Sequence, residues 1–154
     1  MKKNILIAIA LSMAPTIALA RPLYIRAIHA PIGVVYKNLV ISLGHEGFKV
    51  PWGLDIEKHL KMANKKLHLP NFNAQHLSDV RAMIVCNPFL FNTIANEDPT
   101  MIELCPLHIT LVSKNGMTYV QYPKESELAA HTPVAAVAKL IDTKIERAIN
   151  AVPQ

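Results

Sequence analysis

Residues 80–91 read VRAMIVCNPFLF, and this stretch combines the two kinds of secondary structure that the domain needs. Val80 to Val85 is an apolar run of strand length, rich in β-branched side chains. Asparagine is favoured as a helix N-cap and proline at the first helical position. An apolar set at helical spacing follows, consisting of Phe89, Leu90, Phe91 and Ile94. Asn87-Pro88 therefore predicts a turn from a buried strand into a helix.

The first residues upstream of this turn predict strand, helix and strand in succession. Leu23–Ile28 alternates as a strand, and Pro31 marks the turn out of it. Between Ile32 and Leu43 apolar residues recur at spacings of three and one, which is one face of a helix. Phe48 to Val50 then begins a short strand. Because Pro51 limits its pairing, we expect this strand at a sheet edge.

A basic amphipathic helix is expected after Asp55, which is a credible N-cap. Its apolar positions are Ile56, Leu60, Ala63 and Leu67, and its charged positions, mostly on the other side, are Glu57, Lys58, Lys61 and Lys65. The segment 70–76 has no clear period and is expected to be a loop. One hypothesis is that this helix, Lys58 to Lys66, and this loop dock on an acidic partner, in which case binding is sensitive to salt.

Downstream of the turn, Asp98-Pro99 repeats the cap-and-proline device and predicts a second, short helix that ends at Cys105-Pro106. Leu107 to Val112 alternates as a strand. Asn115-Gly116 is a strong two-residue hairpin signal, and Met117 to Tyr122 returns as the partner strand. These residues predict a tight antiparallel hairpin.

The C-terminal part of the chain predicts a long helix. Glu125 to Ala130 is expected to form a preceding helical turn, and Thr132-Pro133 is expected to cap the long helix. Its apolar stripe is Val134, Val137, Ile141, Ile145 and Ala148. The chain is thus predicted to be an α+β domain with about five short strands, about four helices and helices covering one face of the sheet.

Several short motifs in order along the chain resemble the domain of unknown function 302 family. They are Gly47-Phe48-Lys49-Val50, Asn87-Pro88, Pro106, and Tyr119-Val120-Gln121-Tyr122-Pro123. The likeness extends from roughly Ile32 to Lys144. It implies a two-layer sandwich similar to TATA-binding-protein-like domains, and homodimers, and it leaves the activity open. Because family members commonly have a small residue where this chain has Cys86, no thiol role is carried over from the family.

The N-terminal residues have the organisation of a secretory signal peptide. Met1-Lys2-Lys3 is followed by an apolar segment and by Ala18-Leu19-Ala20 before Arg21. We expect cleavage near Ala20, a single domain over residues 21–154, and a location in the periplasm or outside the cell. No later stretch has the roughly 18 apolar residues of a membrane span. Without the signal, 14 basic residues face 11 acidic ones. This small excess argues against a nucleic-acid partner.

The two cysteines, Cys86 and Cys105, have three alternative interpretations. Export makes a disulfide feasible, and closing this loop of about 20 residues stabilises a domain by roughly 3 kcal/mol. Two separate buried thiols are the second alternative, and a reactive or ligating pair is the third. The sequence does not choose among them, because pairing depends on geometry.

Neither the histidines nor the carboxylates form a recognised catalytic or metal-binding motif. The seven histidines lack the close helical or knuckle spacing of zinc ligands, and scattered surface histidines are the simpler interpretation. If a metal or haem binds, the cluster to inspect is His108 with Cys86 or Cys105. The acidic residues Glu97, Asp98 and Glu103 are explained by a helix cap and its solvated neighbours. The sequence therefore specifies no cofactor.

The favoured hypothesis is an exported, non-catalytic ligand-binding or assembly domain. It presents the turns at Cys86 to Phe89 and Leu104 to His108 to a ligand or partner. The candidate ligand-binding residues are Cys86, Asn87, Pro88, Phe89, Cys105, Pro106 and His108. The ligand is an unidentified small molecule or protein. The alternative function is a thiol-dependent redox or sulfur-handling protein that uses Cys86 and Cys105. Trp52, Phe89 and Phe91 either line a ligand cleft or fill the core.

Overall fold

The computed structural model describes residues 22–154, and the predicted signal peptide lies outside them. Five strands form one antiparallel sheet in the order β1-β5-β4-β3-β2. The strands are β1 (Leu23–Ile28), β2 (Lys49–Asp55), β3 (Asp79–Cys86), β4 (Leu107–Lys114) and β5 (Met117–Pro123). The helices are α1 (Ile32–His45), α2 (Ile56–Leu67), α3 (Pro88–Glu97), the 3₁₀ helix η1 (Pro99–Leu104), α4 (Glu125–Leu128) and α5 (Ala135–Asn150).

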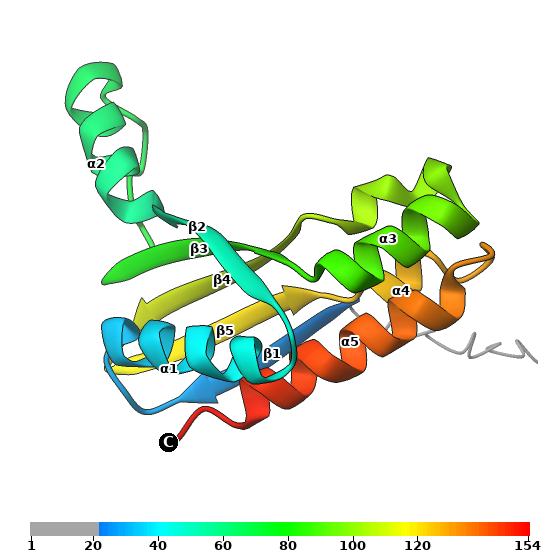
Figure 1. The fold of residues 1–154 in the computed structure, drawn as a ribbon. Coiled ribbons are helices and arrows are strands. Elements are labelled where there is room, and N and C mark those ends of the chain that lie inside the picture. Colours follow the sequence, from blue (N-terminus) through cyan, green and yellow to red (C-terminus); the bar gives the residue numbers. More distant parts are fainter. Residues whose placement is uncertain (1–21) are drawn as a thin grey trace, which may run out of the picture.

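Helices α1 and α5 cover one face of the sheet (Figure 1). The core between the two layers is built from alternate strand residues and from the apolar stripes of both helices. These buried residues include Val35, Leu39, Leu43, Met83, Val85, Ile109, Leu111, Val120, Ile141, Ile145 and Ile149. Fully burying a side chain of this size stabilises a fold by about 1.5–3 kcal/mol. The predicted α+β two-layer architecture is confirmed.

The opposite face of the sheet, called here the open face, has a mostly apolar surface. Cross-strand pairs such as Ile84 with His108 and Val112 with Tyr119 place its side chains together, because directly opposed residues lie on one side of a sheet. Its central residues are Ile25, Trp52, Leu54, Ala82, Ile84, Thr110, Val112, Tyr119 and Gln121. All of them are exposed or half-buried, whereas their sequence neighbours on β4 and β5 are mostly buried.

Helix α2 stands apart from the helix layer, beyond the β2–β3 side of the sheet (Figure 1). Its predicted cap is confirmed, because the Asp55 carboxylate accepts a hydrogen bond of 2.8 Å from the Lys58 backbone nitrogen. None of its residues is buried. Its Leu60 shares a small cavity of about 170 Å³ with Phe72, Leu77 and Val80. Among the described residues, helix α2 therefore packs mainly against its own connecting loop and the start of β3.

One local prediction was wrong. Thr132 does not cap the long helix, which begins at Ala135; its hydroxyl instead donates a hydrogen bond of 2.9 Å to the Ala129 carbonyl in the preceding turn. The short helix predicted after Asp98 is present and is a 3₁₀ helix. The predicted edge strand is also present; it continues through Pro51 to Asp55, with a register shift between Lys49 and Trp52 that accommodates the proline.

Candidate functional site

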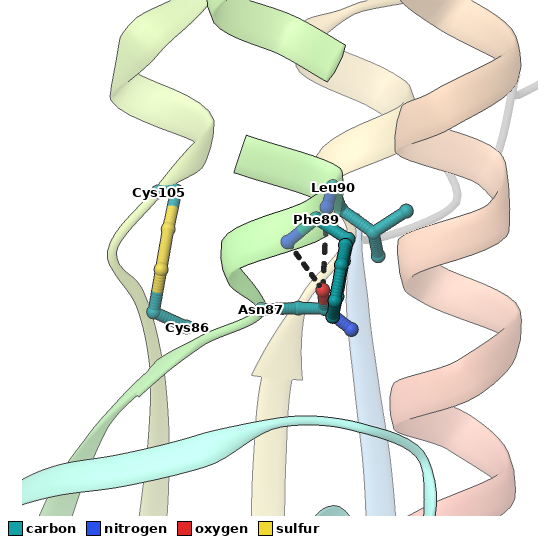
Figure 2. Close-up of a disulfide and its surroundings, with 5 residues drawn as sticks. All are labelled: Cys86, Asn87, Phe89, Leu90 and Cys105. Atoms are coloured by element: carbon teal, nitrogen blue, oxygen red, sulfur yellow. Dashed lines mark hydrogen bonds between the residues drawn. A yellow bond between two sulfur atoms is a disulfide. The ribbon is translucent and has the colours of Figure 1, made fainter. Parts of the chain in front are cut away.

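The turn from β3 into α3 has the predicted structure, and Asn87 holds it (Figure 2). The Asn87 side-chain oxygen accepts hydrogen bonds of 3.0 and 3.2 Å from the backbone nitrogens of Phe89 and Leu90. Pro88 occupies the first turn of the helix, where a missing N–H costs nothing. The Asn87 side chain is buried, and a Cβ at Gly47 would lie 3.1 Å from its amide nitrogen. Asn87 therefore has a structural role at this turn.

Cys86 and Cys105 form a disulfide that joins the end of β3 to the end of η1 (Figure 2). Their Cα atoms are 6.0 Å apart, within the usual range, and 19 residues separate them in the chain. Of the three alternatives for the cysteines, the structure has the disulfide. With both sulfur atoms bonded to each other, neither is a thiolate ligand for a metal beside His108. Across residues 22–154 no three His, Cys, Asp or Glu side chains converge in a way that would hold a metal ion.

The two most prominent aromatic candidates project away from the core. The exposed fraction is 82% for Phe89 on α3 and 65% for Trp52 on β2. Neither lines the cavity beside the disulfide described below. Phe91 is half-buried. The interpretation of these aromatics as core residues is therefore wrong for Phe89 and Trp52, which are surface side chains.

A cavity of about 420 Å³ lies where η1, the start of β4, the end of β5 and α4 meet. Two of the predicted site residues, Pro106 and His108, line it. The other lining residues are Pro22, Glu103, Pro123, Lys124, Glu125, Glu127 and Leu128. We call Glu103, Glu125 and Glu127 the acidic corner. Lys124 is the one lysine among the lining residues, and its ammonium pairs with Glu146 at 2.8 Å.

Asp142 on α5 holds the short helix α4, which carries two residues of the acidic corner. Its buried carboxylate accepts hydrogen bonds from the Tyr122 hydroxyl at 2.8 Å and from the backbone nitrogens of Glu125 and Ser126 at 2.9 and 3.1 Å. The two backbone donors belong to the first turn of α4, so Asp142 anchors that short helix. Burial, followed by the charge of Asp142, raises the pKa of Tyr122, which keeps its hydroxyl protonated as the donor.

The environment of Glu125 favours its protonated form. Burial first, then the negative charges of Asp142 and Glu103, raises the pKa of Glu125 to about 7. The ion pair with Glu146, in contrast, raises the pKa of Lys124 and keeps it cationic. The charge of the acidic corner therefore becomes more negative as the pH rises through neutrality. A cation placed in the cavity would favour the charged form of Glu125.

Sequence reasoning identified one wall of this cavity and missed the other. Pro106 and His108 were expected at a site, whereas Glu103 was interpreted as a solvated acid and the residues of α4 were given no role. A helix of four residues leaves almost no periodic signal. The usable signal was Asp142, an acidic residue directly after Ile141 in the apolar stripe of a long helix. A buried carboxylate requires partners, and these partners form α4.

The fold agrees with known proteins that have no assigned activity. The family model described as "Domain of unknown function DUF302" matches residues 24–152. The crystal structure of an uncharacterized conserved DUF302 protein from Bacillus stearothermophilus superposes with a TM-score of 0.75 at 21% identity, covering 86% of this chain and 99% of that one. No match was found among curated proteins. In the part of the chain that the structure describes, no helix combines the length and apolarity of a membrane span.

Proposed function

The chain belongs to the DUF302 family, and from this premise we propose that it is an exported, non-catalytic binding or assembly domain that acts as a homodimer. The observation that carries this proposal is the open face of the sheet. It is apolar, it includes an exposed tryptophan, and it ends at an acidic cavity. These are features of a surface that binds another molecule.

The open face supports assembly because large apolar side chains are exposed on it together. Trp52, Ile25 and Leu54 are exposed, and Ile84, Val112 and Tyr119 between them are half-buried. Tryptophan is enriched among the residues that dominate the energetics of protein interfaces. A contiguous apolar patch of this kind is unusual on a protein that remains a monomer.

The acidic corner supports binding of a cationic group. Glu103 and Glu127 are exposed at the cavity, and Lys124 is already neutralised by Glu146. The ligand class that fits is a basic side chain or a small organic amine. None of the lining residues carries a hydroxyl or thiol nucleophile, which favours binding over covalent catalysis.

Native mass spectrometry of the full-length gene product, expressed in a bacterium and recovered from the exported fraction without reductant, tests this proposal. We expect a dimer whose chains begin near Arg21 and carry the two-hydrogen mass loss of one disulfide. A monomer at all concentrations would refute the homodimer. An uncleaved chain retained in the cytoplasm would refute export.

A second candidate function, thiol-dependent redox chemistry, is favoured by the position of the disulfide. Cys86 and Cys105 are only half-buried, and Cys86 directly precedes the N-terminus of α3, which stabilises a thiolate there. A dithiol partner would reduce the disulfide to two thiols with two electrons and two protons and would itself become a disulfide. Turnover of a dithiol substrate that is lost in Cys86→Ser, with the fold intact, would favour this function over the first.

A further inference from the structure

The open face and helix α2 together indicate how the proposed homodimer is arranged. We infer that two copies pack with their open faces together and that the basic helix α2 of each copy lies on the acidic corner of the other. This inference rests on the proposed homodimer and adds to it the contacting segment, the recognised charge and the symmetry. The arrangement is an isologous two-fold dimer, in which both contacts are the same.

Within residues 22–154, helix α2 is covered only in part, by its connecting loop and the start of β3. It is 12 residues long, a length that is marginal for an isolated helix in water, and it buries no residue completely. Leu60, Met62 and Leu67 remain exposed, with 69% of Leu67 accessible. A helix of this length with so little cover gains stability when a second surface contacts it.

The charges of α2 and of the acidic corner are complementary. Helix α2 carries Lys58, Lys61, Lys65 and Lys66, all exposed, and its single acid, Glu57, already pairs with Lys61. The acidic corner carries three glutamates, and its lysine pairs with Glu146. A second copy of this chain therefore supplies the acidic surface that a basic helix requires.

The sheet topology places these two features at opposite corners of the open face. Helix α2 follows β2 at Asp55, which pairs with Arg81 near the start of β3, at the end of the sheet where β4 finishes. The acidic corner lies at the other end, where β4 begins at Leu107 and β5 ends at Pro123. Strand β2 forms one edge of the sheet, and β5 lies beside the opposite edge. The line from α2 to the acidic corner is therefore a diagonal of the sheet. A two-fold axis that lies between the two facing sheets and is perpendicular to this diagonal brings each α2 to the partner's acidic corner.

The open face supplies about two thirds of the area that a stable dimer needs. Five strands about 4.8 Å apart and about seven residues long, at about 3.3 Å per residue, give a face on the order of 550 Å². A standard interface covers about 800 Å² on each partner. The sheet face alone falls short of this value, and contact through α2 supplies the additional surface.

Trp52 provides a direct probe because it is the only tryptophan of the chain and lies on the open face. Dilution of the mature protein should shift its fluorescence to longer wavelength as the dimer dissociates and Trp52 becomes hydrated. Sedimentation equilibrium then gives the dissociation constant at low and high salt. We expect dissociation to increase with salt.

Charge reversal tests the contact between α2 of one copy and the acidic corner of the other, called here the arm contact. Lys58→Glu with Lys65→Glu should raise the dissociation constant at low salt by about tenfold or more, because two contacts are repelled in each half of the dimer. Glu103→Lys with Glu127→Lys should have a similar effect. Combining all four substitutions in one chain should restore the affinity to within about threefold of the original. The matched control is Lys37→Glu with Lys139→Glu, two exposed lysines on α1 and α5 that should leave the dimer unchanged.

The outcomes separate this inference from the proposal on which it rests. A wild-type monomer with a hydrated Trp52 would refute the homodimer and the arm contact together. The homodimer would stand and the arm contact would be refuted if neither charge reversal changed the dissociation constant of the dimer. The same conclusion would follow if the chain with all four substitutions did not recover the original affinity. Circular dichroism of every variant establishes that the fold is intact before affinities are compared.

Discussion

Helices α5 and α2 are both amphipathic, yet their surroundings differ completely. Helix α5 buries six residues, including Ile141, Ile145 and Ile149, against the sheet. Helix α2 buries none and extends beyond the sheet (Figure 1). An amphipathic pattern thus predicts a helix and the side that is apolar, but it does not predict which surface covers that side. For α2, we propose that the covering surface belongs to a second copy of the chain.

The largest expected effect comes from truncating equivalent apolar side chains in the two helices. Ile145→Ala should reduce the free energy of unfolding by about 2–5 kcal/mol, because it leaves a cavity in a packed core. Leu60→Ala should cost less than about 1 kcal/mol in the monomer, since 45% of Leu60 is accessible to solvent. Urea unfolding at a protein concentration low enough to dissociate the proposed dimer measures both. Equal losses would break the comparison.

A smaller effect is expected from polar substitutions in the two helices. Asp142→Asn should cost about 1–3 kcal/mol, because a buried amide cannot accept all three hydrogen bonds that the carboxylate accepts. Tyr122→Phe removes one donor and leaves both backbone donors paired, so its cost should be lower. The matched change in α2 is Glu57→Gln, which removes a surface ion pair with Lys61 and should cost less than about 0.5 kcal/mol. Thermal unfolding that ranks Glu57→Gln as the most damaging would contradict this prediction.

An effect that varies with pH is expected from Glu125, which lies at the end of the sheet where α5 and α4 pack. Its pKa is raised from 4.5 to about 7 in the folded protein, so the folded state binds more protons than the unfolded state between these values. The contribution of Glu125 to the free energy of unfolding is therefore fully present below about pH 4.5 and is lost as the pH rises through 7. Glu125→Gln should flatten this part of the profile of melting temperature against pH. An unchanged slope in that variant would assign the pH dependence to other groups.

The features that sequence reasoning predicted well depend on residues close together in the chain. The caps at Asp55, Asn87 and Asp98 accept hydrogen bonds from backbone nitrogens two or three residues ahead, so a local pattern suffices to find them. The Asn115-Gly116 hairpin is equally local. The Thr132 cap was predicted on the same principle and was wrong, because a competing acceptor in the preceding turn is also local but was not considered.

Sequence reasoning singled out only part of the cavity lining because the lining residues come from separate elements. Pro106 and His108 follow Cys105 at the start of β4, whereas a short helix anchored on Asp142 brings Glu125 and Glu127 to them. Asp142 and Glu125 are 17 residues apart, and their contact exists only when α5 packs on the sheet. The pKa of Glu125 depends on the same packing.

By itself, the sequence determined the order of strands and helices, the amphipathic sides of the helices and the hairpin, because each of these depends on residues that interact within a few positions. Only the tertiary structure decided that Cys86 and Cys105 pair, that Trp52 lies on an open sheet face, and that α2 and the acidic corner occupy opposite corners of that face. Those facts depend on strand order and register, which bring together residues distant in the chain and are chosen by the packing of the whole core.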